Sequence, residues 1–449
     1  MTPQTPPNGR LLNDGVLKRE VFGWALYDFA NSGYTTVVLT AVFNAYFVSV
    51  VADGAAWGTL AWTLAVAASS LIAMLTLPAL GAHADRYAAK KRLLGFCTVA
   101  CVVATAALAE AGRGDLWLAV VAVIVSNVAY TYGEALIAAF LPELARPESL
   151  GRVSGWGWSF GYLGGMLALG LSLAYVLGAQ ARGEPATSFV PVTMLITAGL
   201  YAVASLGTFV LLRERAVPQA ARVATGGERA ATAAVADEAD ASLARLAHSW
   251  RLARSYRDFS WLLLCGASYQ AGISVVVALA AVYAEQALGF KQADTMALIF
   301  LVNIAAAGGA FGFGYWQDRV GHKPALAATL VGWIVMTALA VAATGPGLFW
   351  CAALLAGLCM GSSQSAGRAM VAQFSPLAHR AEFFGLWTFA IRASAVLGLL
   401  TYGAVTWLTD GNQRLAMAAT GLFFVGGLLL LTRVDIARGQ RAARGEAPA

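Results

Sequence analysis

The feature that most constrains this chain is a series of twelve long apolar segments that are nearly free of charged residues. Each is about 17 residues or longer, the length that a helix needs to cross the hydrocarbon core of a bilayer. The sequence therefore predicts an all-α membrane protein with twelve transmembrane helices. The expected spans are residues 21–51, 58–80, 93–109, 116–141, 153–177, 189–212, 259–288, 296–316, 325–343, 348–374, 383–408 and 415–431.

The composition excludes the soluble classes of protein. Of the 449 residues, 59% are apolar and 12% are charged, against about 45–50% and about 25% in an average soluble protein. So few charges cannot cover the surface of a soluble enzyme, a nucleic-acid-binding domain or a disordered scaffold. The net charge of +6 comes from basic residues in short connections between apolar segments, so we expect a lipid bilayer and no nucleic acid as partner.

The sequence lacks the residue patterns of an enzyme. All five cysteines lie inside apolar segments, and none has the paired spacing of a zinc site. There is no P-loop, nucleophile elbow or cluster of metal ligands. We therefore predict a protein that is not an enzyme and that needs no cofactor or metal.

The positions of lysine and arginine predict the orientation. With a cytoplasmic N-terminus, 24 of the 30 basic residues fall on the cytoplasmic side and four on the other, which is the usual bias of membrane proteins. We expect both termini in the cytoplasm of a multi-pass inner-membrane protein. The expected parts are a tail at 1–20, a first half at 21–212, a linker at 213–258 with a surface helix around 242–257, a second half at 259–432 and a tail at 433–449.

The two halves repeat one another. Gly-Ala-His-Ala-Asp-Arg at 81–86 recurs as Gly-Tyr-Trp-Gln-Asp-Arg at 314–319, so that Asp85 and Asp318 are 233 residues apart. Pro142 and Pro376, each after a later span, are 234 residues apart. Six-helix halves related as parallel repeats are the architecture of the major facilitator superfamily. The chain resembles that superfamily, which implies that spans 1, 4, 7 and 10 line a central cavity.

The repeated motif resembles the signature cytoplasmic loop of these transporters. A glycine lets two helices approach closely, and an aspartate can accept hydrogen bonds from a neighbouring helix N-terminus. Such contacts could act as a gate, although basic loops also follow from orientation alone. The second copy is complete, whereas Ala88 replaces the second glycine of the first copy. The expected gating residues are Gly81, Asp85, Arg86, Gly314, Asp318, Arg319, Gly321 and Lys323.

Four charged residues lie inside the predicted spans at similar depth. The acids Asp28 and Glu134 belong to the first half, and Arg368 and Arg392 belong to the second half. Charges within a membrane are costly and are kept mainly for function. They could bind substrate or couple transport to protons, or they could form permanent structural bridges between the halves. Six polar residues extend the candidate site, namely Asn31, Asn127, Tyr130, Tyr269, Gln270 and Gln364.

Regularly spaced glycines mark two further spans. Gly157, Gly161 and Gly165 recur every four residues in span 5, and Gly308 and Gly312 do so in span 8. Such small-residue faces permit close helix packing. The superfamily resemblance implies that these two spans meet between the halves, where smooth faces could also allow rocking.

Longer motifs resemble the vacuole effluxer family, the autophagy-related branch of the superfamily. They are WALYDFANS at 24–32, LPELA at 141–145, GRVSGWG at 151–157, GYLGG at 161–165, and Gln364, Arg368 and EFFG at 382–385. Fungal members of that family export amino acids from the vacuole. The chain departs from the family pattern at Arg392, where members often have lysine, and at Ile137-Ala138, where they often have Tyr-Asn.

These observations predict a secondary transporter that moves a small polar or zwitterionic, amino-acid-like solute by alternating access. We expect Arg368 to hold a carboxylate, Glu134 to contact the substrate and Asp28 to carry a coupling proton, with the protein acting as a monomer. Export of drugs or lipid-like amphiphiles is an alternative, as is a non-transporting receptor on the same fold.

Overall fold

The computed structural model describes residues 11–55, 57–216, 218, 250–288 and 292–446, and these residues are almost entirely helical. Twelve of the described helical segments are long and apolar enough to cross a membrane, which confirms the predicted fold class. Much of the predicted linker at 213–258 lies outside the described residues. The described part of its expected surface helix, residues 250–255, is helical.

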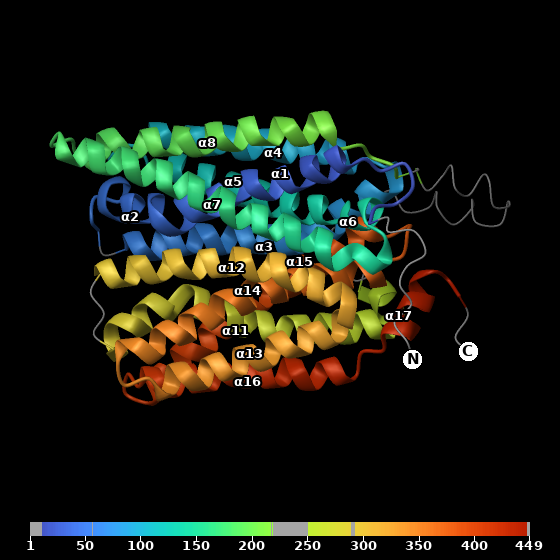
Figure 1. Cartoon of the computed structure of the whole chain (residues 1–449). Helices are drawn as coiled ribbons and strands as arrows, with labels where there is room; N and C mark the ends of the chain where they lie inside the picture. The colour runs from blue at the N-terminus through green and yellow to red at the C-terminus, as the bar shows by residue number, and fades with distance from the viewer. Residues whose placement is uncertain (1–10, 56, 217, 219–249, 289–291, 447–449) are drawn as a thin grey trace.

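The first six spans form one bundle in Figure 1. They are α1 (Lys18–Tyr34) with its continuation η1 (Thr35–Ala41), α2 (Phe43–Tyr46) and η2 (Phe47–Val51), then α3 (Gly58–Tyr87), α4 (Lys90–Ala107) with η3 (Leu108–Glu110), α5 (Leu116–Ala138) with α6 (Leu141–Leu144), η4 (Pro147–Ser149) with α7 (Leu150–Ala181), and α8 (Ala186–Leu211).

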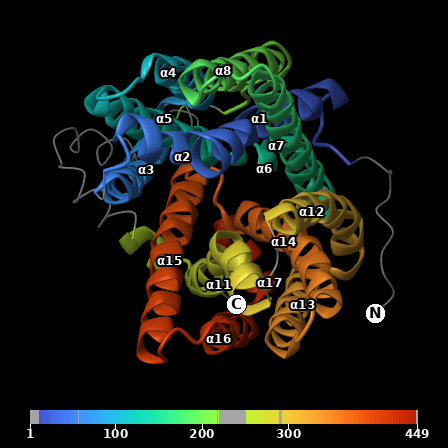
Figure 2. The same cartoon turned by 90° about the vertical axis from the view of Figure 1, so that its left-hand side faces the viewer.

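The last six spans form the second bundle, which lies below the first in both Figure 1 and Figure 2. They are α11 (Arg257–Leu288), α12 (Gln292–Val320), α13 (His322–Ala342), α14 (Pro346–Phe374), α15 (Arg380–Leu408) and α16 (Gln413–Thr432), followed by the short α17 (Ile436–Ala443). Between the bundles, α7 packs against α12 and α3 packs against α15.

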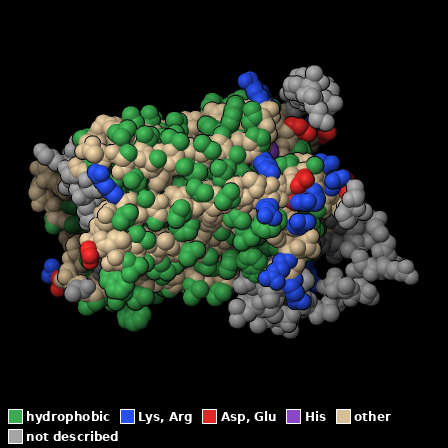
Figure 3. All heavy atoms as spheres, turned by 90° about the horizontal axis from the view of Figure 1, so that it is seen from below, with side chains coloured by type: hydrophobic (Ala, Val, Ile, Leu, Met, Phe, Trp, Pro, Cys, Tyr) green, Lys and Arg blue, Asp and Glu red, His purple; other side chains and the backbone are tan. Residues whose placement is uncertain are grey.

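The two ends of the molecule differ in charge. Figure 3 shows apolar side chains over the length of the bundle, with lysine and arginine gathered mainly at the end that carries α17. The described N-terminal segment lies at this end too, because Leu12 pairs with Ala145 beside α6. We call this end the basic end and the other the opposite end. The predicted orientation would place the basic end in the cytoplasm.

The predicted gating loops are helical in the structure, which corrects that expectation. α3 continues through Gly81, Asp85 and Arg86, and α12 continues through Gly314, Asp318 and Arg319. Only Gly321 lies between helices, and Lys323 already belongs to α13. The apolar segments end earlier than the helices do, because a helix extends beyond the bilayer core once its polar last turn packs against a neighbour.

The glycines of span 5 also serve a different contact from the one expected. A side chain at Gly157 would collide with Asp28 and Trp24, and one at Gly161 would meet Ser32, so this face packs on α1 within the first half. The approach of α7 to α12 depends instead on Gly155, which abuts the backbone of α12, and on Gly314. The two spans do meet between the halves, as the resemblance implied. The regularly spaced glycines of α7 pack on α1, however, and Gly308 and Gly312 of α12 have open space where a side chain would lie.

Candidate functional site

A cavity of about 430 Å³ lies between the two halves. Helices α5 and α7 of the first half and α11, α14 and α15 of the second half contribute its walls. Six of the predicted site residues line it, namely Tyr130, Glu134, Gln270, Gln364, Arg368 and Arg392. The structure therefore brings together charged and polar side chains that are up to 262 residues apart in the sequence.

Arg368 reaches across to the other half and pairs with Asp28. Its Nη1 lies 2.5 Å from Asp28 Oδ2, and the two side chains are only 7% and 6% exposed. The guanidinium also lies over the rings of Trp158 and Trp24, at 4.8 and 5.4 Å from their centroids. These aromatic faces stabilise a cation without neutralising it. Arg368 thus has a carboxylate on one side and the cavity on another.

Arg392 and Glu134 form the second ion pair between the halves. Arg392 Nη2 lies 3.3 Å from Glu134 Oε2, and the side chains are 25% and 29% exposed. The guanidinium lies 5.9 Å from the centre of the Tyr130 ring. Because both charged groups line the cavity, this pair is open to a solute that enters it.

An amide pair completes the polar wall. Gln270 on α11 and Gln364 on α14 exchange hydrogen bonds of 2.6 and 3.3 Å between their side-chain amides. Arg368 lies one helical turn beyond Gln364 on α14, so the two side chains share one face of that helix.

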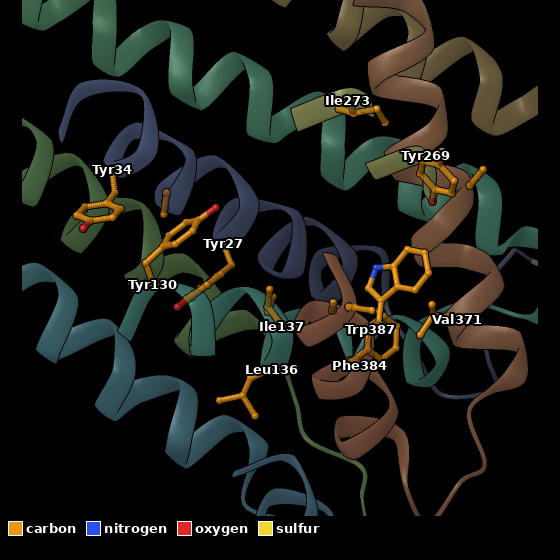
Figure 4. Close-up of a cluster of buried hydrophobic side chains, with 14 of the residues drawn as sticks. Tyr27, Tyr34, Tyr130, Leu136, Ile137, Tyr269, Ile273, Val371, Phe384 and Trp387 are labelled. Atoms are coloured by element: carbon orange, nitrogen blue, oxygen red, sulfur yellow. The ribbon is translucent and has the colours of Figure 1, made fainter. Parts of the chain in front are cut away.

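Three predicted residues lie elsewhere. Asn127 donates from Nδ2 to Ser69 Oγ at 2.7 Å, within the first half. Tyr269 is fully buried and packs against Gly427 of α16. Asn31 is buried in α1 at 4% exposure. Figure 4 shows Tyr269 on α11 well apart from Tyr130, whose ring lies beside that of Tyr34 in the first half.

Several cavity residues were missed by the sequence analysis. Trp158, Trp387, Thr388, Ser274 and Thr35 line the same cavity. Figure 4 shows Trp387 and Phe384 close together on one helix, α15. A signal for Trp158 was available, because it directly follows the GRVSGWG motif, but a tryptophan in an apolar span has no property that distinguishes cavity from core.

Two matched contacts join the halves at the basic end. Asp318 of α12 accepts hydrogen bonds from the backbone N–H groups of Gly151 and Arg152, at 2.9 and 3.2 Å, and from Arg152 Nε at 2.6 Å. Asp85 of α3 accepts one from the N–H of Glu382 at 3.1 Å. Each aspartate thus caps the N-terminus of a helix in the other half, where the helix dipole favours a negative charge.

A histidine lies beside the second of these contacts, outside the spans. His379 Nδ1 is 2.9 Å from Glu382 Oε2. Burial lowers the pKa of His379, but the hydrogen bond and charge of Glu382, with the charge of Asp85, outweigh it and leave the pKa raised above its ordinary value of 6.5.

The contacts and the cavity together define which side is closed. The caps at Asp318 and Asp85 hold the halves together at the basic end, and the ion pairs continue that contact inward. Beyond Arg368 the cavity extends along α1 and α14 toward the opposite end, where Thr40 and Phe349 line its continuation. The structure is closed at the basic end.

Comparison with known proteins agrees with this architecture. Residues 59–151 and 148–444 match the vacuole effluxer Atg22-like family. The chain is 26% identical over 416 residues to YxiO, an uncharacterised MFS-type transporter of Bacillus subtilis (strain 168), covering 92% of this chain and 94% of that one.

Solved structures show the same fold. The proton:xylose symporter XylE superposes with a TM-score of 0.69 at 15% identity, over 92% of this chain and 94% of that chain. A bacterial homologue of the iron transporter ferroportin, in an outward-facing state, gives 0.67 at 14% identity, over 92% and 98%.

Proposed function

The chain belongs to the vacuole effluxer Atg22-like family of major facilitator transporters, and from this premise we propose that it moves a small zwitterionic, amino-acid-like solute by proton-coupled alternating access. The family and the fold identify a membrane transporter and not an enzyme. Substrate, coupling ion and site roles are the parts that we propose.

The observation that carries the substrate class is the partly exposed Glu134–Arg392 pair. Its two groups present opposite charges to one cavity, 3.3 Å apart. A zwitterion carries the complementary charges at a similar separation, so its carboxylate can bind Arg392 or Arg368 while its ammonium binds Glu134. When the zwitterion binds, the one ion pair within the protein is replaced by two ion pairs with the substrate. No charge is then left unpaired in a low-dielectric site, where an unpaired charge is costly.

The buried pair supplies a route for coupling. Asp28 holds Arg368 at the cavity wall while it is ionised. Protonation of Asp28 would remove the negative charge and leave the guanidinium available for a substrate carboxylate. Proton and substrate would then favour the same conformation, and a ligand shifts a conformational equilibrium only through such differential binding. The proton:xylose symporter is a precedent for proton coupling on this fold.

Uptake into proteoliposomes with an imposed pH gradient tests the proposal. We expect at least one radiolabelled neutral amino acid to accumulate when protons drive it, and Glu134→Gln to raise its half-saturating concentration about tenfold, the usual effect of losing one charged hydrogen bond. Arg182→Gln is the matched control, because Arg182 is a 56% exposed surface residue far from the cavity. If no zwitterion accumulates and none binds, the proposed substrate class is wrong.

A further inference from the structure

The cavity continues into a second chamber of about 390 Å³. We call it the apolar chamber. It shares lining residues with the polar cavity, among them Thr35, Tyr130, Glu134, Trp158 and Val277, so the two are contiguous. A solute bound at Glu134 therefore borders on this chamber.

The second half forms most of the chamber wall, from apolar side chains. Representative ones are Leu298, Val302, Met336, Phe349, Ala353 and Met360. Met336, Met360 and Met417 come from three different helices, α13, α14 and α16. Methionine is flexible and polarisable, and it recurs on surfaces that accept apolar groups of varied shape.

Several polar groups of the chamber are used within the protein. On the α1 side, the hydroxyl of Ser32 donates to the Asp28 carbonyl, and those of Thr35 and Thr36 donate to the Ser32 carbonyl. On the far side, Trp333 Nε1 donates to Ser363 Oγ at 3.3 Å. Because these four donors already have partners, this part of the chamber wall favours an apolar occupant.

At the border between the polar cavity and the apolar chamber, one hydrogen-bond donor is left without a partner among the described residues. Trp158 lines both chambers, and its indole N–H is buried with no hydrogen-bond partner in the described structure. A buried donor of this kind ordinarily has a partner. A polar group of a bound solute, placed beside Glu134 and Arg368, would supply one.

We propose that the substrate is a zwitterionic amphiphile, with its head on Glu134 and Arg392 and a single apolar tail, longer than the side chain of any standard amino acid, in the apolar chamber. This inference rests on the proposed transport of a zwitterion. The polar cavity alone already falls within the roughly 300–1,000 Å³ of ordinary ligand pockets, so a contiguous chamber of similar size has room for a second part of the ligand.

The test is a homologous series in which only the tail grows. Alanine, norleucine, 2-aminooctanoate and 2-aminododecanoate are titrated against the protein in nanodiscs, with tryptophan fluorescence as the readout. We expect affinity to rise about fourfold for each methylene group that enters the chamber, the factor expected from apolar burial, until the chamber is full. Affinity that is flat or falls beyond norleucine overturns the proposal.

Three variants separate binding in the chamber from partition into lipid. Ala353→Phe fills the chamber, and we expect it to lower the affinity for 2-aminododecanoate at least tenfold while leaving alanine unaffected. Leu354→Phe is its neighbour on the exposed face of α14, at 43% exposure, and is the control that should change neither. Met336→Ala enlarges the chamber and should move the optimum to a longer tail. Tail-length dependence that is the same in all three variants reports lipid partition and overturns the proposal.

Transport is measured separately on the same series. Chain-length-dependent binding without accumulation of any member would reject the proposed transport and retain the chamber as a binding site. Accumulation of short members only, with no gain in affinity from the tail, would retain the transport proposal and reject the amphiphile.

Discussion

The two ion pairs that join the halves have the same chemistry and opposite surroundings. Asp28–Arg368 is buried, with both side chains at most 7% exposed, and lies against two tryptophan rings. Glu134–Arg392 is a quarter or more exposed and lines the cavity. Removing one member of a buried pair leaves an unpaired charge in a low-dielectric site, whereas water can replace the partner of an exposed one. The difference shows that burial, more than residue type, decides what a membrane-embedded pair can do.

The largest expected effect is a difference in stability between variants of the buried pair and variants of the exposed pair. Arg368→Met leaves the buried Asp28 carboxylate unpaired and should cost about 3–5 kcal/mol. Arg392→Met should cost at most about 1 kcal/mol, because water can solvate Glu134. Thermal unfolding in detergent measures both. Asp28→Asn combined with Arg368→Met should recover part of the loss, and equal losses in the two single variants would contradict the distinction.

The next effect concerns transport. Asp28→Asn should abolish proton-driven accumulation while substrate exchange across the membrane persists, because asparagine imitates the protonated carboxyl, which leaves Arg368 available to the substrate, and has no proton to release. Glu134→Gln should weaken both activities together, because it removes a proposed contact with the substrate. Proteoliposomes with and without a pH gradient distinguish the two patterns. An Asp28→Asn protein that still concentrates substrate when only protons drive it would exclude Asp28 as the coupling site.

A smaller effect on uptake is expected from the two helix-capping aspartates at the basic end, because they accept different hydrogen bonds. Asp318 accepts three hydrogen bonds from the N-terminus of α7 and Arg152, whereas Asp85 accepts the N–H of Glu382 at the N-terminus of α15. Asp318→Asn should therefore impair uptake more than Asp85→Asn, by about 1 kcal/mol or about fivefold in the closed population. Uptake rates at matched expression provide the measurement, and equal losses would remove the asymmetry.

The turns that follow these aspartates also predict a larger loss for Asp318→Asn than for Asp85→Asn. Gly321 has φ 95° and ψ 155°, a conformation open essentially to glycine alone, and Ala88 takes the left-handed φ of 50° in the first copy. A left-handed conformation costs a residue with a Cβ about 1 kcal/mol. Ala88→Gly should thus reduce the difference between the two caps.

The smallest effect is a dependence on pH at the Asp85 contact. The folded protein raises the pKa of His379 through Glu382 and Asp85, against the opposing effect of burial. The stabilisation is therefore fully present below about pH 6.5, the ordinary value of histidine, and is lost as the pH rises through the higher folded value. The melting temperature should fall by a few degrees over that range in the wild type, and less in His379→Gln. An identical fall in both would assign the dependence to other groups.

The sequence was sufficient for the fold and for part of the site. Twelve apolar segments, the repeat at Asp85 and Asp318, and four intramembrane charges predicted an architecture that the structure confirms. The charges were predictable because their cost in a membrane restricts where they can lie, so that acids in one half and arginines in the other were expected to meet.

The sequence did not predict which neighbouring helix each helix face would contact. Asn127, Tyr130 and Glu134 share one side of α5 by spacing, yet Asn127 turns to Ser69 while the other two line the cavity. A three- or four-residue repeat shows which side chains are neighbours and not which helix they will contact. The same limit explains why the glycines of α7 were matched to α12 instead of α1.

The exchange of caps between the halves has a consequence for assembly. Asp85 of the first half caps α15 of the second, and Asp318 of the second half caps α7 of the first, so each half gives and receives a contact of the same kind. This is the self-complementary interface of a two-fold dimer, here between protomers fused in tandem. A covalent connection between two binding partners raises the effective concentration of one near the other. Two separately synthesised halves would still carry the described groups of this interface, so we expect them to associate.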